Sequence, residues 1–194
     1  MSLRTTTIER KTKEVDIKLS VNLDGTGISE INTSIPFLDH LLVIFTQYSR
    51  SDLQIVAQGD LQHHIVEDIA ICLGSAINAL LEDKTGLTRY SFEYIAMDDS
   101  LARAVVDIGG RPYFRLDLNL DQALVEGLAK ENIEHFLETF ALIAKITLHL
   151  EILYGKNDHH KIEAGFKALA QALRKAVTVD PTLADQIKST KGVL

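Results

Sequence analysis

Two short stretches of the sequence repeat one pattern, in which two adjacent histidines precede a glutamate by three and four residues. They are "HHIVE" at residues 63–67 and "HHKIE" at residues 159–163, and they use four of the chain's seven histidines. Residues three and four apart share one face of a helix, so each glutamate would lie beside its histidines. Imidazole and carboxylate ligands suit divalent Mn, Fe, Co, Ni or Zn, and the absence of thiolates argues against a closed structural zinc site. The pattern therefore predicts metal binding.

Each HHxxE stretch also has a histidine upstream of it, next to an acidic residue. His40 in "FLDHLL" lies 23 residues before His63, and His135 in "NIEHFL" lies 24 residues before His159. This repetition predicts two metal ions with open coordination positions. The two sets of ligand candidates are His40, His63, His64 and Glu67, and His135, His159, His160 and Glu163. Adjacent histidines diverge by about 100° on a helix, so one stretch could also serve two different metals.

A simpler interpretation of one HHxxE stretch is a polar helix start whose glutamate favours the helix dipole. Two stretches with matching upstream partners make that interpretation much weaker. The seventh histidine, His149, lies in the alternating pattern "TLHLEI" without a counterpart in the other half, so we expect it to have a structural or supporting role.

Several cations could bind an anionic substrate near these metals. Lys167 lies four residues beyond Glu163 and continues the same helical face, whereas the first half has Ile71 at the equivalent position. Arg111 in "GGRPYF" and Lys191 in the terminal "KSTKGVL" are further anion-binding candidates. A solvated lysine, an exposed arginine and a mobile tail are the alternatives for these three residues.

Composition restricts the class of protein. The chain has 194 residues, of which 46% are hydrophobic and 24% charged, which predicts one globular unit or two tightly joined halves. The net charge of −7 argues against general nucleic-acid binding. Without an apolar run of membrane-spanning length or a signal-peptide pattern, we expect no membrane association and a cytoplasmic location. The one cysteine, Cys72, lies in an apolar helical pattern and is expected to be buried.

Hydrophobic periodicity predicts the elements that position these residues. The first half is expected to contain strands at 5–14, 15–23 and 28–35, a helix after Pro36, a strand at 51–61 and a helix at 63–83. The second half is expected to contain strands at 89–97, 100–108 and 112–120, a helix from about 132, a strand at 147–154 and a helix at 159–177. A hairpin is the simplest interpretation of the first strands. Both halves follow the order βββαβα, which indicates an internal duplication.

The sequence resembles the imidazoleglycerol-phosphate dehydratase family along almost its whole length. The resemblance rests on "TKE", "NLDGTG", "PFLDHLL", "GD", "HHIVEDIAICLG", "RY", "GGRPY", "EHF", "TLH", "GKNDHHKIEAGFKALAQALR" and "STKG". It implies an α+β fold of the ribosomal protein S5 domain 2-like class, in which two mixed sheets enclose a helical layer. The expected division is residues 1–92 and 93–185 for the two halves and 186–194 for a substrate-contacting tail, together one structural unit.

The resemblance also implies a set of site residues and an assembly. The metal ligands would be His40, His63, His64, Glu67, His135, His159, His160 and Glu163, which hold two Mn²⁺ ions per active site, with other divalent transition metals as alternatives. Glu14 would be the catalytic acid and base, and the contacts to substrate and phosphate would be Arg89, Arg111, Lys167, Ser189 and Lys191. The active sites would lie between subunits of a homo-oligomer, a 24-mer built from trimers.

The implied reaction is the loss of water from D-erythro-imidazole-glycerol phosphate to give imidazole-acetol phosphate, a step of histidine biosynthesis. Two metals bound to the ring nitrogens would favour the imidazolate, which expels the neighbouring hydroxyl and leaves a diazafulvene-like intermediate. The adjacent C–H then becomes acidic enough for Glu14 to remove its proton. Contacts to the phosphate would hold the flexible chain so that this carboxylate meets one hydrogen.

This sequence differs from the family pattern at four places. Only Leu61 and Gln62 separate "GD" from "HH", where the family has a longer link with an aspartate, so we expect one ligand histidine to lack its hydrogen-bond acceptor. The other differences are Tyr48 in place of a histidine, Gly109 in place of a serine and Lys188 in place of a proline.

Two other functions remain open on the sequence alone. A dinuclear metallohydrolase could use the same ligand types to release inorganic phosphate from a phosphoester. A metal-stabilised or metal-storage oligomer would need the ligands, but it would not depend on Glu14 or Lys167.

Overall fold

The structure of the protein is a computed structural model that describes residues 3–183 and 186–194. The first half contains β1 (Thr5–Lys11), β2 (Val15–Asn22), β3 (Ser29–Asn32), α1 (Pro36–Ser49), β4 (Asp52–Gly59) and α2 (Gln62–Leu80). The second half contains β5 (Tyr90–Met97), β6 (Ser100–Asp107), β7 (Tyr113–Asp117), β8 (Leu124–Val125), β9 (Leu128–Ala129), α3 (Lys130–Ile143), β10 (Thr147–Tyr154) and α4 (Asp158–Ala176), followed by a short 3₁₀ helix (Pro181–Leu183).

The predicted order βββαβα is confirmed in both halves, with the hairpin β8–β9 added in the second. The two four-stranded sheets have equivalent strand orders, β1-β2-β4-β3 and β5-β6-β10-β7. Each sheet is mixed, because its last two strands pair in parallel and the others pair antiparallel. The division at residues 92 and 93 stays a prediction, and residue 185 lies outside the described residues.

The predicted hairpin joins β1 and β2, which pair from Thr5 with Asn22 to Lys11 with Asp16. The strand after the Asp24–Gly27 turn does not continue this hairpin. Instead, β3 runs parallel to β4 at the other edge of the sheet. Helix α1 connects these two strands, as a parallel pair requires a crossover.

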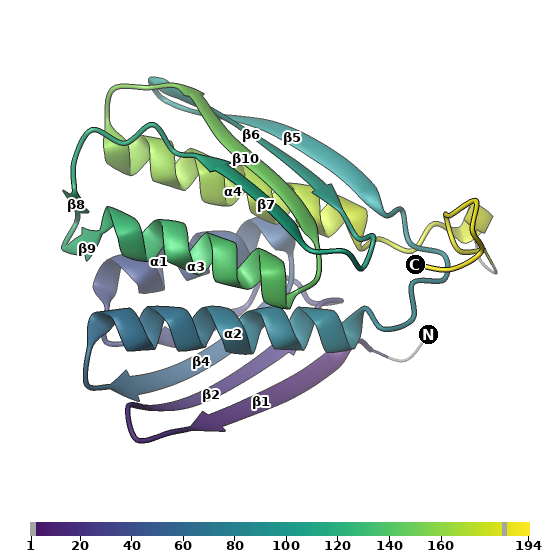
Figure 1. Cartoon of the computed structure of the whole chain (residues 1–194), viewed down its shortest axis with the longest axis horizontal. Helices are drawn as coiled ribbons and strands as arrows, with labels where there is room; N and C mark the ends of the chain where they lie inside the picture. The colour runs from purple at the N-terminus through teal and green to yellow at the C-terminus, as the bar shows by residue number, and fades with distance from the viewer. Residues whose placement is uncertain (1–2, 184–185) are drawn as a thin grey trace.

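Alternating side chains turn one face of each sheet toward the helices. Along β2, Val15, Ile17, Leu19 and Val21 are buried, while the residues between them face outward. Figure 1 shows the resulting layers, with all four helices between the two sheets. The fold is therefore α+β with sheets that enclose a helical layer, as predicted. Cys72 is buried in this layer, also as predicted.

The helices pack across the two halves. Helix α1 packs against α4, and α2 packs against α3. Phe45 of α1 meets Phe140 of α3 edge to face at 6.1 Å between ring centroids, and Phe136 of α3 stacks on Phe166 of α4 at the same separation. One continuous core therefore joins the halves.

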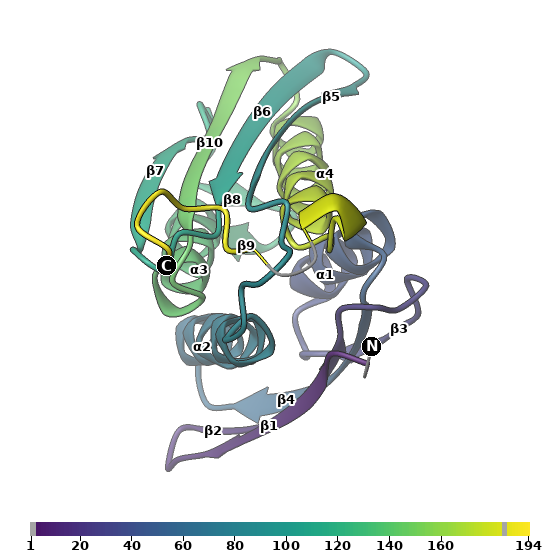
Figure 2. The same cartoon turned by 90° about the vertical axis from the view of Figure 1, so that its right-hand side faces the viewer.

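The helical layer has two distinct ends. Figure 1 shows the starts of α2, α3 and α4 at the end that also bears β8–β9, while both chain termini lie at the opposite end. Figure 2 looks onto the end with the termini, where the C-terminal segment passes beside the second sheet. No helix in the described ranges has the length and apolar character needed to span a membrane.

Candidate functional site

Two histidine and glutamate clusters form at the starts of the HHxxE helices. In the first cluster, Glu163 Oε1 accepts hydrogen bonds from His40 Nε2 at 2.6 Å and from His159 Nε2 at 3.0 Å. The rings of His40 and His159 lie 5.7 Å apart, and Phe37 packs against both. One potential ligand atom from each of the three polar residues lies within 4.8 Å of the other two.

The second cluster consists of His63, Glu67 and His135. Glu67 lies 3.8 Å from His63 Nε2 and 3.5 Å from His135 Nε2, and the two imidazole rings stack at 5.2 Å. Although it is buried, His135 Nε2 has no hydrogen-bond partner among the described residues. A buried nitrogen without a partner is costly unless a further ligand occupies the site, and the donor set suits a divalent transition metal. Both clusters therefore fit a metal ion.

The grouping of the histidines differs from the one that their order along the chain indicated. His40 belongs to the first half but joins His159 and Glu163 of the second, and His135 joins the HHxxE stretch of the first half. The cause is the packing of α1 on α4 and of α2 on α3. Each cluster is thus made from both halves, and neither half could form one alone.

The charge on Glu163 is stabilised within the chain. Burial alone raises the pKa of this carboxyl, but the Lys167 ammonium and the hydrogen bonds from His40 and His159 outweigh it and lower the pKa to about 2. Lys167 Nζ lies 2.8 Å from Glu163 Oε2 and 3.1 Å from Met97 Sδ. Its ammonium also lies 5.7 Å from the centre of the Tyr48 ring. Lys167 therefore adjoins the first cluster, as the helical spacing predicted.

The second histidine of each HHxxE stretch belongs to neither cluster. His64 Nδ1 donates to Asp60 Oδ1 at 2.7 Å, and His160 Nδ1 donates to Asp99 Oδ1 at 2.6 Å. The bond to Asp60 raises the pKa of His64. The expectation that the short Leu61–Gln62 link leaves a histidine without an acceptor is therefore wrong, because Asp60 itself supplies the oxygen.

Glu14 lies in the turn between β1 and β2, at the same end of the molecule. The backbone N–H of Asp60 donates to Glu14 O at 3.0 Å, and a Cβ atom at Gly59 would lie 2.9 Å from that oxygen. The "GD" motif therefore lets the turn approach β4 and fixes it there. The Glu14 carboxylate stays 56% exposed and lies 4.0 Å from His64 Nδ1.

A third group of predicted residues lies at the opposite end. Arg89, Arg111, Ser189 and Lys191 line one pocket of about 530 Å³, together with Lys188. The buried Arg89 guanidinium donates to Asp107 at 2.8 Å and to Lys188 O at 2.5 Å, which anchors the tail. Cations and a hydroxyl around one pocket suit a phosphate group.

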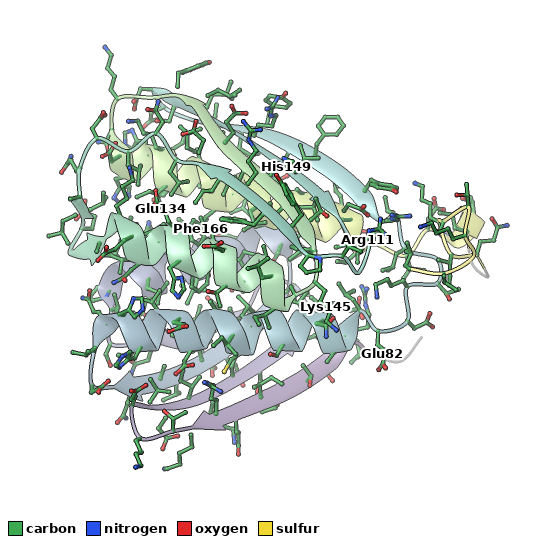
Figure 3. All side chains as sticks on the ribbon, viewed as in Figure 1. Glu82, Arg111, Glu134, Lys145, His149 and Phe166 are labelled. Atoms are coloured by element: carbon green, nitrogen blue, oxygen red, sulfur yellow. The ribbon has the colours of Figure 1, made fainter. Side chains whose placement is uncertain are left out.

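The tail pocket and the two histidine and glutamate clusters of one chain are far apart. The backbone N–H of Arg89 bonds to Ala176 O at the end of α4, whereas His159 lies in the first turn of that helix, so the helix rise alone separates them by about 25 Å. Figure 3 shows this separation, with Arg111 near the termini and Glu134, the neighbour of His135, toward the other end. His149 lies on the outer side of β10 against the ring of Tyr113, away from both regions.

Several residues beside the histidine and glutamate clusters were not predicted. They are Asp60 and Asp99, together with Asn132, whose Oδ1 lies 3.0 Å from His63 Nδ1, and Glu126, whose Oε1 lies 3.3 Å from His159 Nδ1. Asp60 belongs to the "GD" motif and so had a sequence signal. The other three come from a hairpin turn, a helix start and the hairpin β8–β9, and their link to the histidines exists only in the folded chain.

Comparison with known proteins agrees with this fold. The profile of the imidazoleglycerol-phosphate dehydratase family matches residues 33–173. A protein of that name from Nitrobacter hamburgensis is 44% identical, with 99% of each chain covered, and one from Chloroherpeton thalassium is 47% identical, with 100% of each covered. The crystal structure of the Staphylococcus aureus dehydratase matches with a TM-score of 0.84 at 39% identity, covering 90% of this chain and 99% of that one. The chain therefore belongs to the imidazoleglycerol-phosphate dehydratase family.

Proposed function

We propose that the protein removes water from D-erythro-1-(imidazol-4-yl)glycerol 3-phosphate to give 3-(imidazol-4-yl)-2-oxopropyl phosphate in histidine biosynthesis. Membership of the family supports this reaction. The observation that supports it most directly is the pair of mixed histidine and glutamate clusters, with the exposed carboxylate of Glu14 beside the HHxxE stretch of the first half.

The two clusters would hold two metal ions, and Mn²⁺ is the ion that the family resemblance implies. His40, His159 and Glu163 would bind one ion, His63, Glu67 and His135 would bind the other, and His64 and His160 would supply further ligands. When bound, such ions act as Lewis acids on the imidazole ring and make departure of the neighbouring hydroxyl easier.

The chain's own residues then select one hydrogen. Glu14 would act as the general base that takes the proton from the carbon bearing the remaining hydroxyl, a role that typically contributes about 10²- to 10⁴-fold in rate. Its exposure and its fixed turn favour contact with a substrate held at the histidines. Lys167 would hold a substrate oxygen, and the tail pocket with Arg111, Ser189 and Lys191 would hold the phosphate.

We infer that the complete site forms between copies of the chain. A separation of about 25 Å is far longer than the glycerol phosphate part of the substrate, so one copy would supply the metals and another the tail pocket. An exposed aromatic surface supports self-association. On the outer face of the second sheet it contains Tyr90, Phe92, Tyr94, Val105 and Tyr113. The family resemblance implies that the final assembly is a 24-mer of trimers.

The reaction is tested by a phosphorus and proton NMR time course with the substrate, in chelated protein and in protein restored with Mn²⁺. We expect Mn²⁺-dependent formation of the ketone with the phosphate retained, and a loss of about 10²- to 10⁴-fold in Glu14→Gln. Lys13→Gln, a change of an exposed residue in the same turn, is the matched control. Release of inorganic phosphate would indicate the metallohydrolase, and no turnover by metal-loaded, assembled protein would indicate the storage oligomer.

The shared site is tested by co-expression of two inactive variants, Glu67→Gln at the metal end and Arg111→Ala in the tail pocket. If the site lies between copies, mixed assemblies should recover up to about a quarter of the wild-type activity, because one random pairing in four joins two intact ends. Each variant alone should stay inactive. Mixed assemblies that are as inactive as the separate variants would contradict a shared site.

A further inference from the structure

All four histidines of the HHxxE stretches have their Nδ1 atom beside a side-chain oxygen. The acceptors are Asn132 for His63, Asp60 for His64, Glu126 for His159 and Asp99 for His160. An amide or carboxylate oxygen only accepts, so a proton fixed on Nδ1 leaves Nε2 as the atom that can bind a metal. His159 differs from the other three, because its Nε2 also bonds to Glu163 Oε1 at 3.0 Å. The shortest of these bonds are those of the second histidines, at 2.7 Å and 2.6 Å.

These two short bonds come from different places in the two halves. Asp99 belongs to the turn between β5 and β6, the counterpart of the β1–β2 turn that carries Glu14. Asp60 belongs instead to the loop between β4 and α2. In the second half the turn carboxylate therefore orients the histidine, whereas in the first half the loop carboxylate does so and the turn carboxylate is left unbonded to it, at 4.0 Å.

We propose that Asp60 is a positioning residue with two effects, which rests on the proposed function above. It holds His64 with Nε2 directed outward for the metal, and it occupies Nδ1 so that Glu14 stays free to act as the base. In the β5–β6 turn Asp99 bonds to Nδ1 and Asp98 lies 3.6 Å from His160 Nε2, whereas in the β1–β2 turn Glu14 lies beside Nδ1 without a bond to it.

The consequence of losing Asp60 follows from the charges that face His64. The carboxylates around this imidazole are Asp60, Glu14 and Glu67, and Glu14 is the next to reach Nδ1. Without the Asp60 oxygen, His64 would lose its orientation or would take Glu14 as its acceptor. Either result weakens metal binding, and the second also removes the base from the substrate.

The test measures Mn²⁺ affinity by electron paramagnetic resonance titration and kcat at saturating Mn²⁺ for Asp60→Ala, Asp60→Asn and Asp99→Ala. We expect Asp60→Ala to weaken Mn²⁺ binding by about 10- to 100-fold and to lower kcat even when the metal saturates. Asp60→Asn keeps an acceptor oxygen, so it should retain most of the Mn²⁺ affinity and most of kcat. Asp99→Ala should lose affinity to a similar extent with a smaller loss of kcat, because the proposed base, Glu14, lies in the other turn.

Gln58→Ala, a change of an exposed residue near the end of β4, two residues before Asp60, is the matched control. Thermal unfolding of the metal-free proteins shows that each variant folds. Wild-type affinity and wild-type kcat in Asp60→Ala would overturn the proposal, and so would an Asp60→Asn variant as impaired as Asp60→Ala. Failure of the proposed function can be distinguished from failure of this proposal. If the proposed function is wrong, wild-type protein would bind Mn²⁺ without forming the ketone. The comparison of Mn²⁺ affinities would still test whether Asp60 orients His64.

Discussion

The two halves of the molecule share one strand order, yet the outer faces of their sheets differ in kind. The first sheet presents polar side chains to the outside, including Thr7, Glu9, Lys18 and Gln54, with Val56 as an isolated apolar residue. The second sheet presents the aromatic surface defined above. Outward residues are not needed to form the sheet, so the duplication has kept the inner faces and changed the outer ones. Contacts with other copies would then favour the second half.

The glutamates of the two HHxxE stretches also differ between the halves, in their exposure and in their partners. Glu163 is 7% exposed and is paired with Lys167, whereas Glu67 is 39% exposed and has Ile71 at the equivalent position one turn later. Both residues face histidines at comparable positions. The comparison indicates that Glu163, unlike Glu67, also neutralises a buried cation.

Exchange of each glutamate for glutamine separates these two roles. Glu163→Gln leaves the 11% exposed Lys167 ammonium without its carboxylate, so the free energy of unfolding of the metal-free protein should fall by about 3 kcal/mol. Glu67→Gln should change it by less than about 0.5 kcal/mol, because its contacts face solvent. Urea unfolding of metal-free protein at one subunit concentration measures both values.

The double variant Glu163→Gln with Lys167→Met provides the control for this comparison. Removal of both charges should recover a large part of the lost stability, because the cost in the single variant comes from the unpaired ammonium. Equal destabilisation by Glu163→Gln and Glu67→Gln would show that the pairing with Lys167 does not distinguish the two halves.

Local patterns predicted most of the fold. The predicted helices at 63–83 and 159–177 correspond to α2 (Gln62–Leu80) and α4 (Asp158–Ala176), because their apolar stripes face a continuous core. The hairpin β8–β9 was missed, since strands of two residues have no readable periodicity. The partner of β3 was missed as well, because pairing between distant strands depends on how the connecting helix packs.

The site was predictable in its residue types but not in its grouping. The repeated spacing selected His63, Glu67, His159 and Glu163, since neighbours on one helix face are fixed by the helix itself. Spacing along the chain could not show that His40 crosses to the second half, because that contact depends on the packing of α1 against α4. It also could not show that the tail pocket lies at the end remote from the histidine and glutamate clusters of the same chain.

The first residues of the central strands β4 and β10 differ in charge, and this difference predicts a smaller effect than the one expected for Glu163→Gln. Asp52 Oδ1 accepts the backbone N–H groups of Thr26, Gly27 and Ile28, whereas the equivalent Thr147 donates its hydroxyl to Arg111 O at 3.2 Å. Burial alone raises the pKa of Asp52, but these hydrogen bonds outweigh it and hold the pKa below its ordinary value. The charged form therefore stabilises the β2–β3 loop.

A folded-state pKa below the unfolded value means that this stabilisation is present above the unfolded pKa of about 4 and is lost as pH falls through the folded pKa. Asp52→Asn should therefore lower the free energy of unfolding by about 1 kcal/mol or less at pH 7, since water screens a partly exposed carboxylate, and the difference from wild type should shrink below about pH 4. Urea unfolding from pH 3 to 7 measures the difference. Thr147→Ala is the control, because it changes no titrating group and its effect on the free energy of unfolding should not vary with pH. If the effect of Asp52→Asn were also independent of pH, the charge of Asp52 would have no role in stability.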